Sequence, residues 1–470
     1  MSTDLLTLPL SALAARYRAL SLSPVEVARE HLARIEAVEA RLNAFQIVDA
    51  EGALAMAHAS AARWRAGAPL SALDGAPVTI KDNMDIAGLP TRNGSLTTPA
   101  TPAATDSPAV ARLREAGAVF LGKTTLPEFG WKGITDSRLR GAATRNPWDL
   151  RRSPGGSTGG GAAALAAGIG TLCFGNDGGG SIRIPACLCG LYGIKPTFGR
   201  VPHHPLEGIF ATVVADGPLA RSVADAAAML AVMARPDDRD WYALPPPADT
   251  WLDDLRPRLR GMRFAYAPNL GGAEPNAEVR ATVDAAIDAI RTYGAVVEDA
   301  GPIIEPLQPL FEPFWFASFA HRLRSIAPDR HDDIDPGYVD IGRRGAEVPV
   351  AAVLAAEAGR AQLYRRFAEL FRRYDLLLTP TTPHAAPLAD TVYHTQGYDR
   401  WRDAIPYTLP FNLTGLPAAS LPCGLTQSGL PVGLQIVGRK FAERDILGAS
   451  LGIEPLFGFA RLREQMMAAL

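Results

Sequence analysis

Helix-like and strand-like segments alternate along most of this chain, and this alternation limits the fold more than any other feature of the sequence. Short apolar runs predict buried strands, and amphipathic stretches between them predict helices. Alternation of this kind favours an α/β fold in which helices cover a largely buried sheet. The clearest strands are expected at residues 77–80, 118–121, 262–267, 376–379, 416–422 and 431–437, the last two as a hairpin or as adjacent strands.

Capping residues and prolines mark where several of these elements begin and end. Ser23-Pro24-Val25-Glu26 is a capping box with proline at the first helical position, and it predicts a helix that runs to Leu42. The first 65 residues are expected to be helical, and another helix is expected from Ser107-Pro108 to Gly117. Three prolines at 245–247 predict a surface connection between two halves of the chain.

Composition and charge exclude several classes of protein. The 470 residues include 47 lysines and arginines and 49 acidic residues, and the net charge of −2 favours neither nucleic acid nor an anionic membrane. Four cysteines are too few for a secreted disulfide scaffold and do not complete a zinc site. Asp4 stands where a signal peptide needs positive charge, and the uncharged run 153–176 holds too many glycines and hydroxyls for a transmembrane helix. We therefore expect a cytoplasmic protein without membrane contact.

Two short motifs match known site patterns in the wrong structural context. Residues 117–124 match the phosphate-binding pattern G-x-x-x-x-G-K-[ST], but a helix is expected before them and their middle is itself a predicted strand. Residues 155–159 match the nucleophile elbow G-x-S-x-G, which needs a strand directly before the serine. Residues 148–154 do not resemble a strand, although Asp375 and His384 would complete the order of a triad. We expect neither motif to perform the function that its pattern suggests.

A longer glycine-rich block at 155–200 contains two glycine-flanked serines, Ser157 and Ser181. Ser181 opens a segment with Pro185 in its expected first helical turn, so a helix N-terminus would add positive potential there. This pattern suits an oxyanion hole beside a nucleophile, whereas a glycine-rich turn with serine caps is the alternative interpretation. Three consecutive glycines before Ser181 let the backbone approach a ligand and direct amide N–H groups toward it: Gly178, Gly179 and Gly180.

Lys81 is the expected general base for these serines. The block itself contains no histidine, whereas Lys81 follows the predicted strand 77–80 at the carboxyl edge of the sheet, where α/β sites gather. Only five of the 47 basic residues are lysines, and only lysine can lose its proton at accessible pH. To act as a base, Lys81 needs a pKa lowered from ~10.4 to ~7–8. A solvated cation at the strand end is the alternative interpretation.

The block reads GGSTGG at 155–160, GNDGGGSIRIP at 175–185 and GIKPT at 193–197, with supporting segments at 80–83, 121–124, 415–418 and 429–435. In these segments the chain resembles the amidase signature family, over about residues 20 to 450. The resemblance implies a single large α/β/α domain around a central mixed β-sheet, spanning residues 1–470. Helices within 1–65 would pack on this domain, and residues 77–200 would hold the catalytic motifs.

The resemblance also implies a Ser-Ser-Lys triad. Carried over position by position, Ser181 is the acyl-forming nucleophile, Ser157 the bridging serine and Lys81 the base. The amides of Gly178, Gly179, Gly180 and Ser181 fall where the family builds its oxyanion hole, and Gly156-Ser157 falls where it carries a cis peptide. This chain departs from the family at three positions without losing a triad atom: Thr158 replaces a frequent serine, and Asn176 and Gly178 replace frequent threonines.

These residues imply an amidase that hydrolyses a small-molecule carboxylic acid amide through an acyl-enzyme, with no metal or organic cofactor. Chain length fits equally the A subunit of a glutamine-dependent tRNA amidotransferase, a glutaminase that acts with partner subunits. For the free-standing enzyme no nucleic-acid contact is expected. The sequence does not decide between a monomer and a homodimer. Five aromatic residues either line an acyl pocket or pack in the core: Phe311, Phe314, Trp315, Phe316 and Phe319.

Overall fold

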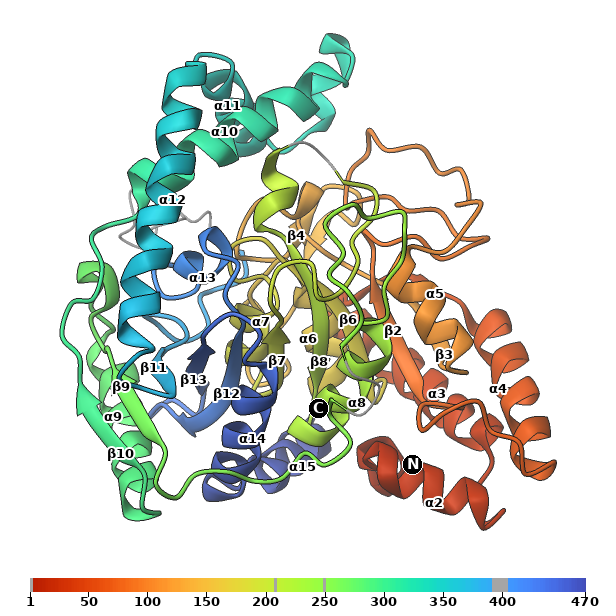
Figure 1. The fold of residues 1–470 in the computed structure, drawn as a ribbon. Helices are drawn as coiled ribbons and strands as arrows, with labels where there is room; N and C mark the ends of the chain where they lie inside the picture. The colour runs from red at the N-terminus through yellow and green to blue at the C-terminus, as the bar shows by residue number, and fades with distance from the viewer. Residues whose placement is uncertain (1–2, 207–208, 248–250, 391–404) are drawn as a thin grey trace.

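A mixed sheet of eleven strands, in the order β1-β3-β2-β6-β8-β7-β12-β13-β11-β9-β10, runs through the centre of the protein (Figure 1). The computed structural model describes residues 3–206, 209–247, 251–390 and 405–470. The strands are β1 (Phe45–Val48), β2 (Pro77–Lys81), β3 (Val119–Thr124), β6 (Leu172–Asp177), β7 (Tyr192–Lys195), β8 (Ala215–Ala220), β9 (Arg263–Tyr266), β10 (Val296–Asp299), β11 (Leu376–Pro380), β12 (Ala418–Leu425) and β13 (Pro431–Gly438). A separate two-stranded sheet pairs β4 (Asp136–Ser137) with β5 (Ala142–Ala143).

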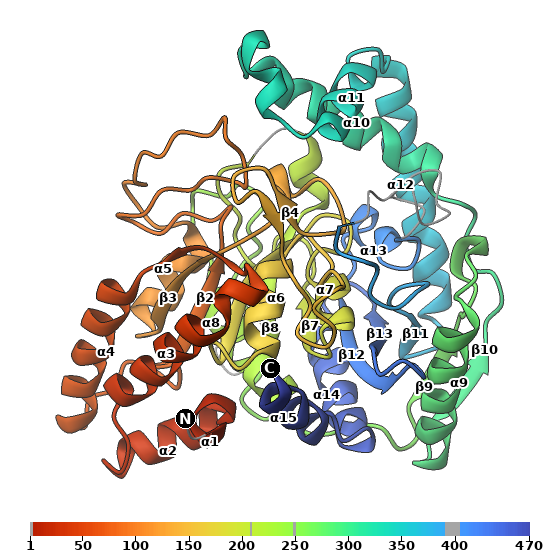
Figure 2. The same ribbon diagram turned by 180° about the vertical axis from the view of Figure 1, so that it is seen from behind.

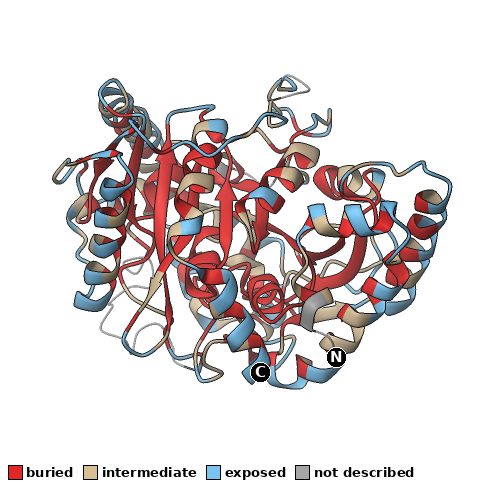
Figure 3. Ribbon diagram, turned by 90° about the horizontal axis from the view of Figure 1, so that it is seen from below, coloured by how far each residue is buried: buried red, intermediate tan, exposed pale blue. Residues whose placement is uncertain are grey.

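Helices cover both faces of the sheet, which confirms the predicted α/β/α layers. Because strand side chains alternate between faces, Phe120 of β3 packs in the core with α5 and α8, whereas Leu121 packs with α3 and α4. Buried strands between helices with exposed outer surfaces are visible in Figure 3. One face carries α3 (Pro24–Leu42), α4 (Ala50–Arg65), α6 (Gly159–Ala166) and α7 (Arg183–Leu188), and the other carries α5 (Pro108–Glu115), α8 (Val223–Met233), α9 (Ala277–Thr292) and α14 (Glu443–Ile453).

The remaining helices lie at the ends of the chain and above one edge of the sheet. Figures 1 and 2 show α10 and α11 together at the top of the molecule, with α12 descending beside them. The chain termini lie at the opposite end, where α2 and α15 are found (Figure 2). The bounds are α1 (Thr3–Thr7), α2 (Leu10–Arg18), α10 (Gln308–Arg324), α11 (Pro336–Gly345), α12 (Val350–Leu370), α13 (Leu409–Leu413) and α15 (Phe459–Ala469). None of the described helices is both long and apolar enough to cross a membrane.

Several predicted boundaries are confirmed, but the prediction of helix throughout the first 65 residues is wrong. The capping box forms at the start of α3, where the Ser23 amide donates to the Glu26 carboxylate at 2.7 Å, and α3 ends at Leu42. Strand β1 then pairs antiparallel with β3 at the edge of the sheet. Four residues are too few to display a strand period, so this edge strand could not be separated from the helices on either side.

All six predicted strands are present, and β12 and β13 pair antiparallel as expected. The run 153–176, interpreted as a loop and a buried helix, also contains most of β6. Strand β8 was missed because Gly217 and Pro218 lie inside it, and both residue types disfavour strands. The glycine is required there, since a Cβ on Gly217 would collide with the Ile194 carbonyl of the neighbouring strand β7.

The two halves of the chain build the two halves of the sheet. Strands within residues 45–220 form one side and strands within residues 263–438 form the other. They meet where β7 pairs antiparallel with β12. The predicted proline connection at 245–247 lies between α8 and β9, and Pro245 and Pro246 are exposed there.

Candidate active site

Three neighbouring strands bring the polar residues of the site to one edge of the sheet. Lys81 is the last residue of β2 and Asp177 the last residue of β6, and these two strands are parallel. Strand β8 runs antiparallel to β6, so its early residue Asp216 pairs with Asn176 at this same edge. The topology therefore gathers side chains that are far apart in the sequence.

Lys81 contacts Ser157 at this edge. The Lys81 Nζ lies 2.7 Å from the Ser157 Oγ and 2.6 Å from the Asn176 Oδ1. Lys81 and Ser157 are both buried, and the Gly156-Ser157 peptide is cis. Burial lowers the pKa of Lys81 to about 7, although the carboxylates of Asp177 and Asp216 partly oppose this change. A lysine with that pKa is neutral in a large fraction of molecules at pH 7 and can accept a proton.

Ser181 lies in the loop between β6 and α7, directly after the three glycines. The Thr158 amide donates to the Ser181 carbonyl at 3.2 Å, so the segments that carry the two serines are adjacent. Ser181 is only half-buried, and within the described part of the chain its hydroxyl makes no hydrogen bond. The structure thus brings together Lys81 and Ser157, but it does not place the two serine hydroxyls in contact. Pro185 is the third residue of α7, as expected for a first-turn proline.

The carboxylate of Asp177 organises the glycine loop. Its Oδ1 accepts from the Gly180 amide at 2.6 Å and its Oδ2 accepts from the Ile182 amide at 3.2 Å. The same two oxygens accept from the Arg183 Nη2 and Nε, both at 2.9 Å, and neither side chain is exposed. Although burial opposes ionisation, the Arg183 guanidinium holds the pKa of the Asp177 carboxyl well below its usual range.

The three glycines before Ser181 allow side chains of other segments to pack closely against the loop. Gly180 has a φ of +127°, and a Cβ there would collide with the Thr408 hydroxyl, which itself donates to the Gly179 carbonyl at 2.6 Å. A Cβ on Gly178 would lie 2.9 Å from the ring of Phe210, and one on Gly179 would lie 3.8 Å from the ring of Trp315. The loop therefore passes against aromatic side chains. All five aromatic residues of the 311–319 segment are buried, as the core interpretation requires.

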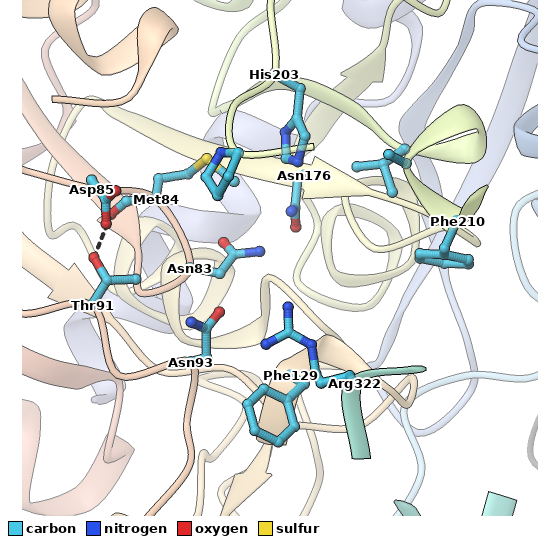
Figure 4. Close-up of a pocket in the computed structure, with 13 residues that line it drawn as sticks. Asn83, Met84, Asp85, Thr91, Asn93, Phe129, Asn176, His203, Phe210 and Arg322 are labelled. Carbon is cyan, nitrogen blue, oxygen red and sulfur yellow. Dashed lines mark hydrogen bonds between the residues drawn. The ribbon is translucent and has the colours of Figure 1, made fainter. Parts of the chain in front are cut away.

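A pocket of about 260 Å³ opens beside Asn176, the second partner of Lys81. Figure 4 shows Asn83, Asn93, His203 and Arg322 directed toward its interior from several elements. The fold brings His203 here, which follows the serine block by three residues. Its Nδ1 lies 3.0 Å from both carboxylate oxygens of Asp216. Within the described residues, no group of three or more His, Cys, Asp or Glu side chains is placed to hold a metal ion.

Sequence reasoning missed the polar residues that support the site. Asp177 and Arg183 stand inside the NDGGGSIRIP segment, so a search for charged residues beside the glycines could have found them. Asp216 had no comparable signal, because only the antiparallel pairing of β8 with β6 brings it to the site. His203 lies in the connection between β7 and β8, and nothing in the sequence places its ring opposite Asp216.

Comparison with known proteins assigns the chain to a family. The family model described as amidase matches residues 26–447. The chain belongs to the amidase signature family. An acylamidase of Rhodococcus erythropolis is 34% identical over 440 residues, and the alignment covers 92% of this chain and 92% of the relative. The A subunit of the glutamyl-tRNA(Gln) amidotransferase of Moorella thermoacetica is 35% identical over 470 residues, with 93% of this chain and 94% of the relative covered.

Solved structures of this amidase signature family have the same fold. A bacterial aryl acylamidase aligns with a TM-score of 0.89 and 28% identity, with 99% of each chain covered. The A subunit of the glutamyl-tRNA(Gln) amidotransferase of Thermotoga maritima aligns with a TM-score of 0.78 and 28% identity, with 96% of this chain and 95% of that chain covered.

In this family member, the two short motifs lack the structures that their patterns require. Residues 119–124 are the buried strand β3, which follows helix α5, and the Lys123 ammonium lies 2.9 Å from the Asp82 carboxylate. Residues 148–154 contain no strand, and the residue in contact with Ser157 is Lys81. The Nδ1 of His384 lies instead 2.9 Å from the Ala385 carbonyl. The predicted helix-strand order before Lys123 is thereby confirmed.

Proposed function

We propose that this amidase signature enzyme hydrolyses a carboxylic acid amide to an acid and an amine or ammonia, with Ser181 as the nucleophile. Ser157 is the bridging serine and Lys81 the general base. The 2.7 Å contact between the buried Lys81 Nζ and the Ser157 Oγ carries this proposal, because it joins a titratable base to a hydroxyl beside the Ser181 loop. The acylamidase among the relatives supports the same reaction.

The proposed first step forms an acyl-enzyme. Neutral Lys81 takes the proton of the Ser157 hydroxyl, and Ser157 takes that of Ser181 as the Ser181 Oγ attacks the amide carbon. The Ser181 hydroxyl turns toward Ser157 to allow this transfer. The carbonyl electron pair moves onto oxygen, and the relay then returns a proton to the nitrogen as the C–N bond breaks. Water completes the reaction by attacking the ester, which releases the acid and restores Ser181.

In the proposed oxyanion hole, the backbone amides of the glycine loop have two different roles. The Gly180 amide already donates to Asp177, so it holds the loop in shape. Within the described residues, the amides of Gly178, Gly179 and Ser181 make no hydrogen bond, and they are the groups we assign to the oxyanion. Preorganised donors of this kind stabilise charge as it develops on the substrate oxygen.

A fluorophosphonate probe tests the nucleophile directly. We expect it to add mass to a peptide that contains Ser181, because only an activated serine reacts rapidly with the probe. Ser181→Ala abolishes this labelling, whereas Ser428→Ala, a change at an exposed turn, leaves it intact. Labelling confined to Ser157 contradicts the assignment.

The similarity to the A subunit of the tRNA amidotransferase supports a second candidate, a glutaminase that works with partner subunits. The purified chain distinguishes the two functions. Hydrolysis of simple amides by this chain alone favours the free-standing amidase. Glutamine hydrolysis that appears only when partner subunits are present favours the amidotransferase function.

A further inference from the structure

Several side chains that line the pocket beside the proposed catalytic residues can donate hydrogen bonds. Asn83, Asn93, His203 and Arg322 all point into it, from segments between residues 83 and 322 (Figure 4). Arg322 has a permanent positive charge, and the amide and imidazole groups can each donate an N–H. Such an arrangement suits an anionic group with several acceptor oxygens more than it suits a neutral chain.

Arg322 is held on the same helix that reaches the glycine loop. Trp315 and Arg322 are seven residues apart on α10, about two helical turns or ~10 Å along the axis, so they lie on one face. A Cβ on Gly179 would contact the Trp315 ring, and the Arg322 Cζ lies 4.9 Å from the centre of the Phe129 ring. Helix α10 thus holds the Trp315 ring near the glycine loop and the Arg322 guanidinium about two turns farther along.

His203 provides a second donor with a defined orientation. Its Nδ1 faces both oxygens of Asp216, and its backbone amide donates to Asp240 at 2.9 Å. Nδ1 must carry a proton to donate to this carboxylate, so the other ring nitrogen, on the side that points into the pocket in Figure 4, donates only when the imidazole is protonated. Burial disfavours the charged imidazolium, but the carboxylates of Asp216 and Asp240 outweigh this and raise the pKa of His203 above its ordinary value.

We propose that this pocket selects amides that carry a carboxylate away from the scissile bond, with Arg322 and His203 as its binding groups. The inference rests on the proposed amidase function and names the substrate class of that site. Asp85 also lines the pocket, but it lies on the Thr91 side, away from Arg322 in Figure 4. The position of Asp85 allows a competing prediction, because that carboxylate would favour an ammonium group instead.

Matched substrates test the charge and its distance from the amide. One series contains the mono-4-nitroanilides of succinic, glutaric, adipic and suberic acids. Each is compared with two analogues of equal chain length, one with a neutral terminus and one with an ω-amino group in place of the carboxylate. A second pair, 4-acetamidobenzoate and acetanilide, places the carboxylate on the amine half. In at least one set we expect kcat/KM for the carboxylate to exceed that of the neutral analogue by about 10-fold or more, the effect of one charge-assisted contact. In the acyl series the rate passes through a maximum with chain length.

Substitutions connect this preference to the pocket. Arg322→Met and His203→Gln each lower the ratio of kcat/KM for the charged and neutral substrates by about 10-fold, mainly through KM. Arg324→Met, an exposed arginine on the same helix, leaves the ratio unchanged. A preference for neutral or ω-amino amides in every set overturns the proposal.

Two further measurements separate this proposal from the proposed function. Fluorophosphonate labelling at Ser181 reports an active nucleophile whichever amide is preferred. Calorimetric binding of adipate, with and without Arg322→Met, reports the carboxylate subsite without turnover. Adipate binding that Arg322→Met abolishes supports the subsite even in a chain that hydrolyses none of these amides, and absence of adipate binding to the unmodified protein contradicts it.

Discussion

Two buried lysines in this protein, Lys81 and Lys195, have a pKa that burial lowers to about 7. Only one of them contacts a hydroxyl group that could pass on a proton. The Lys195 Nζ donates to the Pro196 carbonyl at 2.9 Å, whereas the Lys81 Nζ meets the Ser157 Oγ. A shifted pKa therefore does not identify the base by itself. The contact with Ser157, at the edge of the sheet where Ser181 also lies, distinguishes Lys81.

We expect Lys81→Met to lower kcat/KM by at least about 10²-fold while the fold stays intact, because the stem remains and the nitrogen is lost. Lys81→Arg is equally damaging, since arginine keeps its proton at any accessible pH. Steady-state kinetics measure both effects, with circular dichroism to verify folding. Lys440→Met, at an exposed position, serves as the control. A folded Lys81→Met enzyme with near-native turnover refutes the Ser-Ser-Lys mechanism.

The pH dependence of kcat/KM gives an independent test of Lys81. As the proposed base, Lys81 must be neutral to accept a proton, and burial lowers its pKa to about 7. Activity therefore rises with pH through this value and levels off above it, instead of rising near the ~10.4 of a free lysine. The rate profile of the wild-type enzyme measures this limb. A profile that stays flat from pH 5 to 9 is inconsistent with Lys81 as the base.

At the scale of elements, the loop between β6 and α7 depends on one buried ion pair. Arg183 joins Asp177 to α13 and β13, since its Nη2 donates to the Asn412 Oδ1 at 2.6 Å and its Nη1 to the Gln435 Oε1 at 2.8 Å. Removing one partner of a buried pair leaves the other charge without compensation, which costs more than the pair itself contributes. The loss of one charge alone is therefore expected to destabilise the loop between β6 and α7.

Arg183→Met is expected to reduce the free energy of unfolding by about 3–5 kcal/mol, because it leaves the Asp177 carboxylate buried and unpaired. The double variant Asp177→Asn/Arg183→Met recovers part of this loss, since no buried charge remains. Urea denaturation measures both. Arg291→Met, which removes a surface pair with Asp288, provides the comparison and has a much smaller effect. A loss below about 1 kcal/mol for Arg183→Met would show that water already compensates Asp177.

The segment 117–124 is predicted not to bind ATP despite its match to a phosphate-binding pattern. Its amides lie in strand β3, which pairs with β1 and β2, so they cannot converge on a phosphate. The Lys123 ammonium is already paired with Asp82 and donates to the Thr91 hydroxyl at 2.6 Å. Isothermal titration should detect no micromolar affinity for ATP. Binding that Lys123→Ala abolishes would contradict this prediction.

The sequence predicted elements that have local signals and missed those that depend on pairing. Capping at Ser23 and the apolar run of β2 are readable from a few residues. Strand β8 is recognisable only from its neighbours β6 and β7, because Gly217 and Pro218 argue against a strand. The same limit applies to the site. Lys81 and the two serines stand in recognisable motifs, whereas His203 reaches the pocket only through tertiary contacts.

At the scale of the whole molecule, the two halves of the chain share both a sheet and a core. Three residue pairs join β7 to β12, including Ile194 with Ala419. One hydrophobic cluster contains side chains from both halves, such as Ile80 and Ile436. We propose on this basis that residues 1–470 form one domain. The candidate site depends on the contact between these halves, because the loop that carries Ser181 belongs to the first half and its supports Asn412 and Gln435 belong to the second.

A fragment of residues 1–247, cut after the exposed prolines, is therefore expected neither to fold fully nor to react at Ser181. Without the second half, β7 loses its partner β12, and the Asp177 carbonyl loses its 2.8 Å hydrogen bond from the Asn412 amide. Calorimetry of the intact chain should give one cooperative transition, and the fragment alone should give none. Co-expression of residues 248–470 should restore fluorophosphonate labelling of Ser181, because the sheet can then close across β7 and β12. Two separate transitions in the intact chain, together with labelling of the isolated fragment, would divide the molecule into two domains.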